Sequence, residues 1–186
     1  MKRFPPLDPQ NLPPGSEDVA EKILSVSSDG LGGPFNLLLR SPPMARRFID
    51  LLTYFNEDTQ VLDPPCRRLA VLVLSRHAGS SYAWWAHRRR AIANGEFPAE
   101  VIDAVNDRRA PGGLTEKQSA VVAFVQDLVE PGLTSRQHFY AVRRHLDDAE
   151  LAELIAFCGT YTAVALILRE SEVGLPEGEV DTLKTG

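Results

Sequence analysis

The chain has 186 residues, of which 44% are hydrophobic and 24% are charged, and its formal net charge at pH 7 is -5. This composition is that of a soluble globular protein, and the negative charge argues against nucleic acid as the natural partner. No run approaches the roughly 20 apolar residues of a membrane span, and no apolar stretch follows the basic pair at the start. We therefore expect a cytoplasmic protein that contacts neither nucleic acid nor a membrane.

The chain begins with a proline-rich segment, residues 1–15, which predicts an extended arm that is either loose or laid across a neighbouring subunit. Ser16 is placed to cap a first helix, and Ser41-Pro42 is a typical start for another. We assign residues 16–175 to a single all-α domain. The polar segment 176–186 predicts a loose tail.

The segment from Arg67 to Ala78 is apolar on every side at its centre, so periodicity alone does not separate a buried helix from a buried strand. We predict a helix, because the segment is about a dozen residues long and no other strand candidate exists to pair with it. Gly79 breaks this helix. Ser80 or Ser81 then caps a helix that runs to the Asn94-Gly95 stop.

Three later helices are predicted by capping boxes, in which a side chain at the cap is answered by Gln or Glu three residues on. The last of these helices is long and apolar, and it suits the centre of a bundle or a subunit interface. A short helix is also expected from Phe97-Pro98 to Val105. The capping boxes pair Thr115 with Gln118, Thr134 with Gln137, and Asp147 with Glu150.

Chemistry-bearing side chains concentrate between His77 and His87, a stretch that holds both tryptophans of the chain. His87 has small alanines on its helix face, and its ordinary pKa of about 6.5 suits proton transfer near neutrality. Ser80 and Tyr82 are candidate hydrogen-bond donors to a developing anion. The alternatives are that His87 is a structural histidine and that Ser80 is only a cap.

Three further residues are candidates for substrate binding. Arg68 and Arg76, on the preceding predicted helix, can each hold a carboxylate. Trp84 is a candidate substrate contact, with core packing as the alternative interpretation. The histidines show no spacing of three or four residues that would place two on one helix face, so we expect no metal site.

The run from Arg67 to His87, followed by Ala91 and the Asn94-Gly95 stop, resembles the core motif of the carboxymuconolactone decarboxylase family, which includes alkyl hydroperoxidase D-like proteins. The likeness covers most of residues 30–175. It implies an all-α, alkyl hydroperoxidase D-like helical bundle that assembles as a homo-oligomer. Trimers or hexamers are usual in the family, and a dimer is possible.

The chain departs from the family motif at three points. Peroxidase members carry a CxxC pair before the histidine, and here those positions hold Ser80 and Ala83, which argues against thiol peroxidase activity. The family's glutamate aligns with Arg68. In the family's Tyr-Glu-Trp element, Ala83 replaces the glutamate.

The resemblance leads to a cofactor-free acid–base enzyme of lyase or isomerase type that acts on a small carboxylate or lactone. In this hypothesis His87 is the proton donor or acceptor, Arg68 an anion anchor, and Ser80 and Tyr82 hydrogen-bond partners. The alternative is an inactive family member that serves as an oligomeric binding or scaffold protein. A redox role for Cys66 is a third and weaker possibility, because free cysteines are commonly buried core residues.

Overall fold

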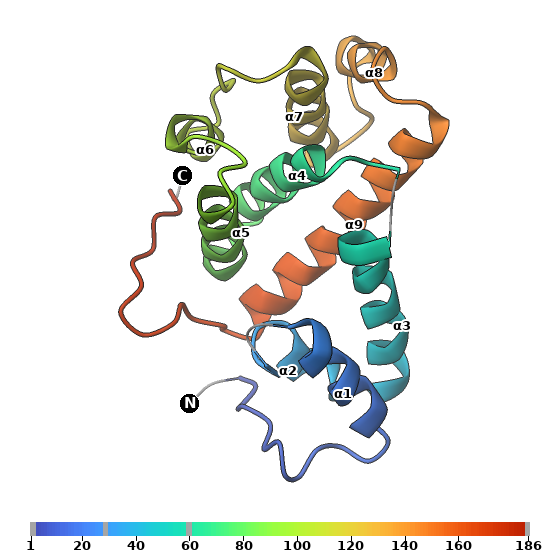
Figure 1. Cartoon of the computed structure of the whole chain (residues 1–186), viewed down its shortest axis with the longest axis vertical. Coiled ribbons are helices and arrows are strands. Elements are labelled where there is room, and N and C mark those ends of the chain that lie inside the picture. The colour runs from blue at the N-terminus through green and yellow to red at the C-terminus, as the bar shows by residue number, and fades with distance from the viewer. Residues whose placement is uncertain (1–2, 28–29, 59–60, 185–186) are drawn as a thin grey trace. The chain divides into compact units, whose positions relative to one another are not determined.

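The computed structural model describes residues 3–27, 30–58 and 61–184. Within these ranges all regular secondary structure is helical, so the predicted all-α class is confirmed. The helices are α1 (Glu17–Val26), α2 (Phe35–Leu38), α3 (Pro42–Thr53), the π-helical turn η1 (Tyr54–Asp58), α4 (Pro64–His77), α5 (Ser81–Ala93), α6 (Ala99–Asn106), α7 (Glu116–Leu128), α8 (Arg136–Arg143) and α9 (Asp148–Glu170) (Figure 1).

The chain forms two compact units. The first comprises residues 1–59 and 167–173, and the second comprises residues 60–166 and 174–186. The long helix α9 contributes to both units.

In the first unit, the proline-rich arm lies against its own chain. The backbone N–H of Leu7 donates to Oδ1 of Asn36 over 2.8 Å. The Arg40 guanidinium donates to the carbonyl of Pro5 and lies over the ring of Phe4, 5.7 Å from its centroid. The described part of the arm therefore has contacts to its own chain, whereas the sequence predicted an arm that is either loose or laid across a neighbouring subunit.

The second unit is built around α4. Every side chain from Leu69 to Arg76 is buried, and α4 packs against α5, α6 and α7. The predicted helix is thus correct, and its uniform apolarity reflects contact on several sides. It begins where the carboxylate of Asp63 accepts the backbone N–H of Cys66 over 2.9 Å. It ends at Gly79, whose φ of 63° lies in the left-handed region that glycine adopts without strain.

Two of the three predicted capping boxes are confirmed. Thr115 and Gln118 cap α7 reciprocally, and Asp147 and Glu150 exchange the same pair of contacts at the start of α9. The box that starts at Thr134 is wrong by one residue. The hydroxyl of Ser135 caps α8 instead, accepting the backbone N–H of His138 over 3.3 Å.

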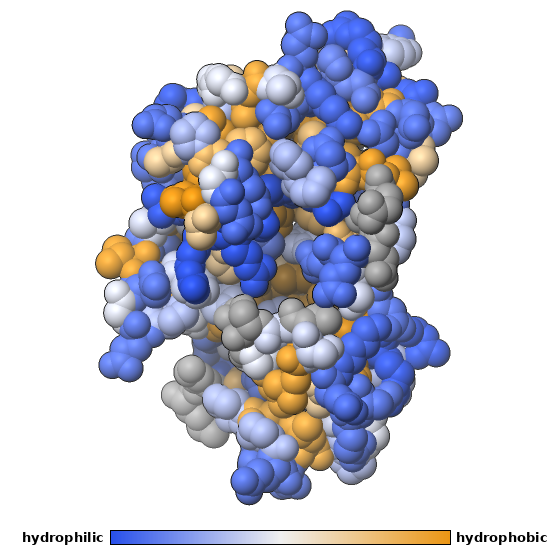
Figure 2. All heavy atoms as spheres, viewed as in Figure 1, coloured by the Kyte–Doolittle hydropathy of each residue, from blue (hydrophilic) through white to orange (hydrophobic). Residues whose placement is uncertain are grey.

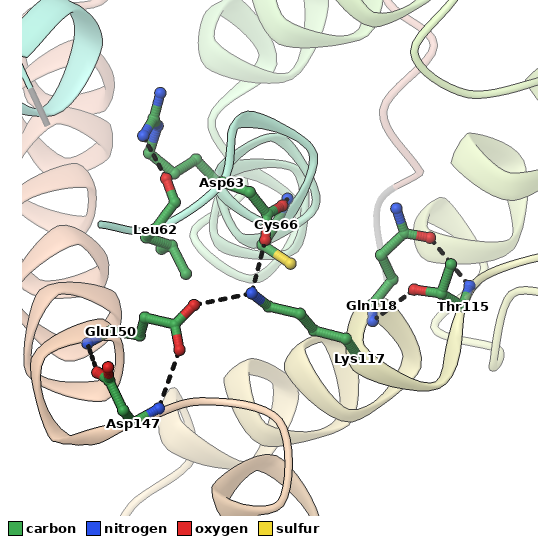
Figure 3. Close-up of polar contacts among 9 residues, drawn as sticks. Leu62, Asp63, Cys66, Thr115, Lys117, Gln118, Asp147 and Glu150 are labelled. Atoms are coloured by element: carbon green, nitrogen blue, oxygen red, sulfur yellow. Dashed lines mark hydrogen bonds and ion pairs between the residues drawn. The ribbon is translucent and has the colours of Figure 1, made fainter. Parts of the chain in front are cut away.

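The starts of α4, α7 and α9 are tied together by one lysine. Nζ of Lys117 lies 2.9 Å from the carboxylate of Asp63 and 2.8 Å from that of Glu150. Figure 3 shows this ammonium between the two carboxylates, with the sulfur of Cys66 close to the cap of α4. Since Asp63 and Glu150 also take part in helix capping, the ion pairs hold three helix ends that are distant in sequence.

Helix α9 corrects one expectation from the sequence. It has 23 residues with a mean hydropathy of 1.9 over its most apolar part, which by length and composition is enough to cross a membrane. Half of that part is buried inside the described structure. On the face of the chain seen in Figure 2, hydrophilic residues cover most of the surface, and hydrophobic residues form patches between them.

The C-terminal segment, expected to be loose, is held in the second unit as far as residue 184. Nε1 of the buried Trp84 donates to Oγ1 of Thr182 over 3.1 Å. The side chain of Asn106 donates to the carbonyl of Thr182 over 2.7 Å and accepts the backbone N–H of Lys184 over 3.0 Å. Buried polar groups on α5 and α6 thereby find their partners in this segment.

Candidate functional site

The hairpin of α4 and α5 brings together a cationic, an imidazole and a carboxylate side chain. Arg68 lies near the start of α4, His87 lies on α5, and Glu96 follows the end of α5. Because the chain reverses at Gly79, residues at similar distances on either side of this joint lie opposite each other. The fold therefore places Arg68 beside His87, a juxtaposition that the sequence left open.

The guanidinium of Arg68 bridges the other two side chains. Its Nη1 lies 2.7 Å from Nδ1 of His87. Its Nε donates to Oε2 of Glu96 over 2.7 Å, and its Nη2 donates to Oε1 over 3.3 Å. The Arg68 and Glu96 side chains are only 19% and 20% exposed, so this two-point ion pair is shielded from solvent.

The geometry fixes the tautomer of His87. A guanidinium carries only donors, so Nδ1 must be the acceptor of the bond from Arg68, and the proton of the neutral ring sits on Nε2. Burial, followed by the positive charges of Arg68 and Arg90, holds the pKa of His87 well below 6.5. The ring is therefore neutral at pH 7 and presents Nε2–H as a donor.

His87 also contacts the second unit's part of α9. Its ring meets that of Tyr161 edge to face, with centroids 5.7 Å apart. Tyr161 in turn stacks on Phe157 at 4.3 Å. These aromatic contacts fix the plane of the imidazole, as Arg68 fixes its tautomer.

Glu96 is the site residue that the sequence reasoning missed. Burial alone would raise the pKa of this carboxyl group, but hydrogen bonds from Arg68 and Asn94 outweigh it and hold the pKa below its ordinary value. The available signal was Arg68 itself, because an arginine on a helix as apolar as α4 needs a carboxylate nearby. The hairpin geometry then points to the residues just after α5.

Ser80 occupies the cap position of α5 and is buried, with an exposed fraction of 3%. Its backbone carbonyl accepts the first bond of the helix from Trp84 over 2.9 Å, but its side chain makes no capping bond. Among the described residues, its Oγ has no hydrogen-bond partner. A buried hydroxyl without a partner is costly, which suits a group that is completed by a bound molecule or an ordered water.

The other two candidates on α5 are not brought to His87. Tyr82 packs its ring against that of Trp85, with centroids 5.6 Å apart. It precedes His87 by five residues, which turns it about 140° around the helix. Trp84 is completely buried and donates to Thr182, so in this structure it is a core residue and does not line a substrate site.

Arg76 lies apart from the other predicted residues. It follows Arg68 by eight residues, about 12 Å along α4. Its Nε donates to the carbonyl of Asn106 over 2.7 Å, and it lines a separate cavity next to α6 and α7. The structure thus separates the two arginines that we expected to be alternatives for one carboxylate.

Neither cysteine fits thiolate chemistry. Cys66 and Cys158 are both free and buried. Burial, with the nearby Asp63, strongly raises the pKa of Cys66, and burial raises that of Cys158 to about 12. Thiols with such pKa values are almost wholly protonated at neutral pH, which weakens the hypothesis of a redox role for Cys66.

Comparisons with known proteins give matches by structure alone. The sequence matches no known family model and no curated protein. A solved structure described as the alkylhydroperoxidase AhpD core of an uncharacterized peroxidase-related protein from Ralstonia eutropha JMP134 matches with a TM-score of 0.79 and 18% identity, over 95% of this chain and 93% of that one.

A second solved structure is a cysteine-to-alanine variant of the debrominase Bmp8 in complex with 2,3,4-tribromopyrrole. It matches with a TM-score of 0.70 and 17% identity, over 94% of this chain and 92% of that one. At these identities the likeness concerns the fold. The chain therefore has the AhpD-core fold that its sequence motif implied, and it shares that fold with an enzyme.

Proposed function

We propose that the protein is a cofactor-free enzyme that acts on a small carboxylate or lactone, with His87 as the central catalytic residue. The observation that carries this proposal is the 2.7 Å contact from Arg68 to Nδ1 of His87. A fold shared with a debrominase is compatible with an enzyme, and the thiols used by peroxidases of the family are replaced by Ser80 and Ala83. The chemistry proposed here therefore relies on oxygen and nitrogen groups.

The sequence left His87 open as either a proton donor or a proton acceptor, and its contacts favour the donor. With Nδ1 engaged by Arg68 and a proton on Nε2, the neutral ring has no unshared lone pair with which to accept a proton. We propose that it acts as a donor, with Nε2–H stabilising the negative charge that develops on a substrate carbonyl oxygen when a carboxylate next to that carbonyl leaves as carbon dioxide, after which the enolate takes a proton from water. A neutral imidazole suits this role, because a charged imidazolium in a site shielded from solvent would cost desolvation free energy.

Glu96 supports this arrangement through Arg68. It balances the guanidinium and directs its Nη1 toward the imidazole. Contacts to described residues occupy three of the five N–H groups of Arg68. The remaining two are the groups that would hold the carboxylate of a substrate, as the sequence suggested for this residue.

The experiment is a comparison of wild-type protein with His87→Ala and His87→Gln on a panel of small lactones and 3-oxocarboxylates, with product formation followed by NMR. We expect kcat to fall about 100-fold or more in His87→Ala, the usual loss when one oxyanion donor is removed. His87→Gln keeps an amide N–H near the position of Nε2–H and should retain part of the rate.

The pH profile separates a donor from a general base. If His87 is neutral throughout, its titration contributes no change in kcat/KM between about pH 6 and pH 8. A general base with an ordinary pKa would produce a limb near pH 6.5 that disappears in His87→Gln. Unchanged turnover in His87→Ala would refute the proposal and favour an inactive scaffold protein.

We further propose that the protein is a homo-oligomer. Ile155, Gly159, Thr162 and Leu166 recur at helical spacing along α9, and all four are exposed in the single chain. Ile155 and Leu166 are 44% and 43% exposed. A stripe of small and apolar residues of this kind, with the one hydroxyl bonded to its own helix, is typical of a surface that a second copy covers.

A further inference from the structure

We propose that the exposed face of α8 binds the acidic segment 176–181 of a second copy of this chain. This α8 face consists of Arg136, Tyr140 and Arg144, all of which are exposed. The three residues are spaced by four, and Arg144 keeps helical backbone angles as the C-cap of α8, so they lie on one side of the helix. The proposal rests on the homo-oligomer proposed above and adds a contact that does not involve α9.

The two arginines of the α8 face have no partner of their own among the described residues, where neither takes part in an ion pair or a side-chain hydrogen bond. Their neighbour Arg143, in contrast, pairs with Asp148. Residues 131–146 contain three arginines and two histidines but neither Asp nor Glu. The α8 face is therefore a cationic surface on a chain whose net charge is -5.

The acidic segment is the complementary surface. It carries the carboxylates of Glu177, Glu179 and Asp181, and every residue from 176 to 181 is exposed. Within the described part of the chain, Glu177 and Glu179 make no ion pair and no side-chain hydrogen bond. Val180, which lies between two of the carboxylates in sequence, is 74% exposed. The segment thus presents unpaired negative charge and an apolar side chain to solvent.

The backbone of the acidic segment is already ordered. A turn closes where the N–H of Glu179 donates to the carbonyl of Pro176 over 3.1 Å. Directly after the segment, Thr182 accepts the indole N–H of Trp84 and the side-chain N–H of Asn106. Because the backbone is held while the side chains stay exposed, binding a partner costs little further conformational entropy.

In this structure one chain does not make the contact with itself, although both surfaces belong to the second unit. Helix α8 packs against α7, whereas the acidic segment is anchored next to α5 and α6. Figure 1 shows them on opposite sides of this unit. A contact between two different surfaces is head-to-tail, so each copy offers one of each. Such a contact builds a closed ring when the rotation between successive copies closes.

The two surfaces match in composition. The α8 face has a guanidinium on each side of Tyr140, which is 61% exposed, and the acidic segment has carboxylates on each side of Val180. Exposed ion pairs contribute only about 0.2–1 kcal/mol each. We therefore expect the charges to select the partner and its orientation, while the ring of Tyr140 and the side chain of Val180 bury apolar surface.

The test reverses the charges of each surface separately and then together. All substituted side chains are exposed, so the melting temperatures should stay close to that of the wild type. A matched control reverses two exposed carboxylates on α6, in the same unit but outside the acidic segment. The variants are Arg136→Glu/Arg144→Glu, Glu177→Arg/Glu179→Arg, the combination of these four substitutions, and the control Glu100→Arg/Asp103→Arg.

The measurement is the association constant between copies, obtained by sedimentation equilibrium at about 50 mM and about 500 mM salt. We expect each double variant to associate at least tenfold more weakly than the wild type at the lower salt, and the difference to shrink at the higher salt. The combined variant should return to within about threefold of the wild type, because each reversed face meets a reversed segment. The control should associate as the wild type does.

A 1:1 mixture of the two double variants is a further test of contact between different copies. Each variant alone brings like charges together, but in the mixture the reversed face of one meets the reversed segment of the other. The mixture should therefore associate more tightly than either variant alone. Equal association of the mixture and the separate variants would contradict a head-to-tail contact.

Wild-type association in either double variant would overturn the proposal, as would a combined variant that associates no more tightly than the double variants. Ile155→Asp distinguishes this contact from the one on α9. Failure of the α9 interface leaves the mass unchanged in Ile155→Asp while charge reversal still weakens association, and failure of the present proposal gives the reverse pattern.

A membrane is the other occupant to test. Binding of the wild type to phosphatidylserine vesicles that is lost in Arg136→Glu/Arg144→Glu, with unchanged association between copies, would assign the α8 face to an anionic lipid surface and overturn the proposal. A wild type that stays monomeric at about 100 μM would refute both this contact and the homo-oligomer.

Discussion

At the scale of single residues, His87 is the side chain whose tautomer and charge are defined most fully by its surroundings. In the folded protein a guanidinium donates to one ring nitrogen, and burial and nearby positive charge keep the pKa of the ring low. A histidine in these surroundings is a fixed donor whose charge does not change near neutrality. The same histidine in the unfolded chain titrates at about pH 6.5.

This difference predicts a pH dependence of stability. Between the low folded-state pKa and about pH 6.5, the unfolded chain binds a proton at His87 that the folded chain does not bind. The free energy of unfolding therefore falls as the pH drops below about 6.5, by at most about 1.4 kcal/mol per pH unit from this residue. Above pH 6.5 this residue contributes no pH dependence.

The measurement is urea unfolding of wild-type protein and His87→Gln at several pH values between about 5 and 8. Glutamine does not titrate, so the difference in unfolding free energy between wild type and variant should change as the pH falls below about 6.5 and stay constant above it. Parallel curves over the whole range would contradict the lowered pKa. Carboxylates such as Glu96 lose their contribution only at lower pH, because their pKa values are held below the ordinary range.

At the scale of elements, the ends of helices are where local and distant interactions meet. Asp63 and Glu150 each take part in capping their own helix, and Lys117 joins them from the first turn of α7. The lysine side chain is 31% exposed, so solvent screens its two ion pairs in part. The three helix starts nonetheless depend on one ammonium group.

Lys117→Met should lower the free energy of unfolding by about 1–2 kcal/mol, because it leaves two carboxylates close together without a cation. Chemical denaturation at neutral pH measures the loss. Lys22→Met is the matched control: its ion pair with Asp50 joins side chains that are 41% and 64% exposed, and its loss should stay within about 0.5 kcal/mol. Equal losses in both variants would show that Lys117 has no special role.

At the scale of the whole molecule, the homo-oligomer that we propose depends on α9. Its sequence is apolar around most of its circumference, while the single chain buries only part of it. Burial of the remaining stripe between two copies would account for the apolar residues that the isolated chain leaves exposed.

Ile155→Asp places a charge on that stripe and should shift the protein to monomers, as measured by size-exclusion chromatography with light scattering. Leu133→Asp is the control, because Leu133 is 99% exposed and lies outside α9. The control should keep the wild-type mass. A monomeric wild type, or an unchanged mass in Ile155→Asp, would contradict an interface on α9.

Much of the helical architecture was accessible from the sequence. The helix over residues 67–78, the break at Gly79, the stop at Asn94-Gly95 and two capping boxes all agree with the structure. These features depend on hydrogen bonds and backbone preferences within about four residues, so the local sequence contains the necessary information. The box at Thr134 was misplaced because Ser135, its neighbour, carries an equally suitable hydroxyl.

The site was accessible only in part, because its partners come from separate segments. The motif located His87 and Arg68, and its departures from the family argued against thiol chemistry. Only the tertiary structure showed that Glu96 pairs with Arg68 from 28 residues away. It also showed that the indole N–H of Trp84 donates to Thr182, and that Arg76 lines a different cavity. Sequence periodicity specifies which face of a helix a residue occupies, but which element covers that face depends on how the whole chain packs.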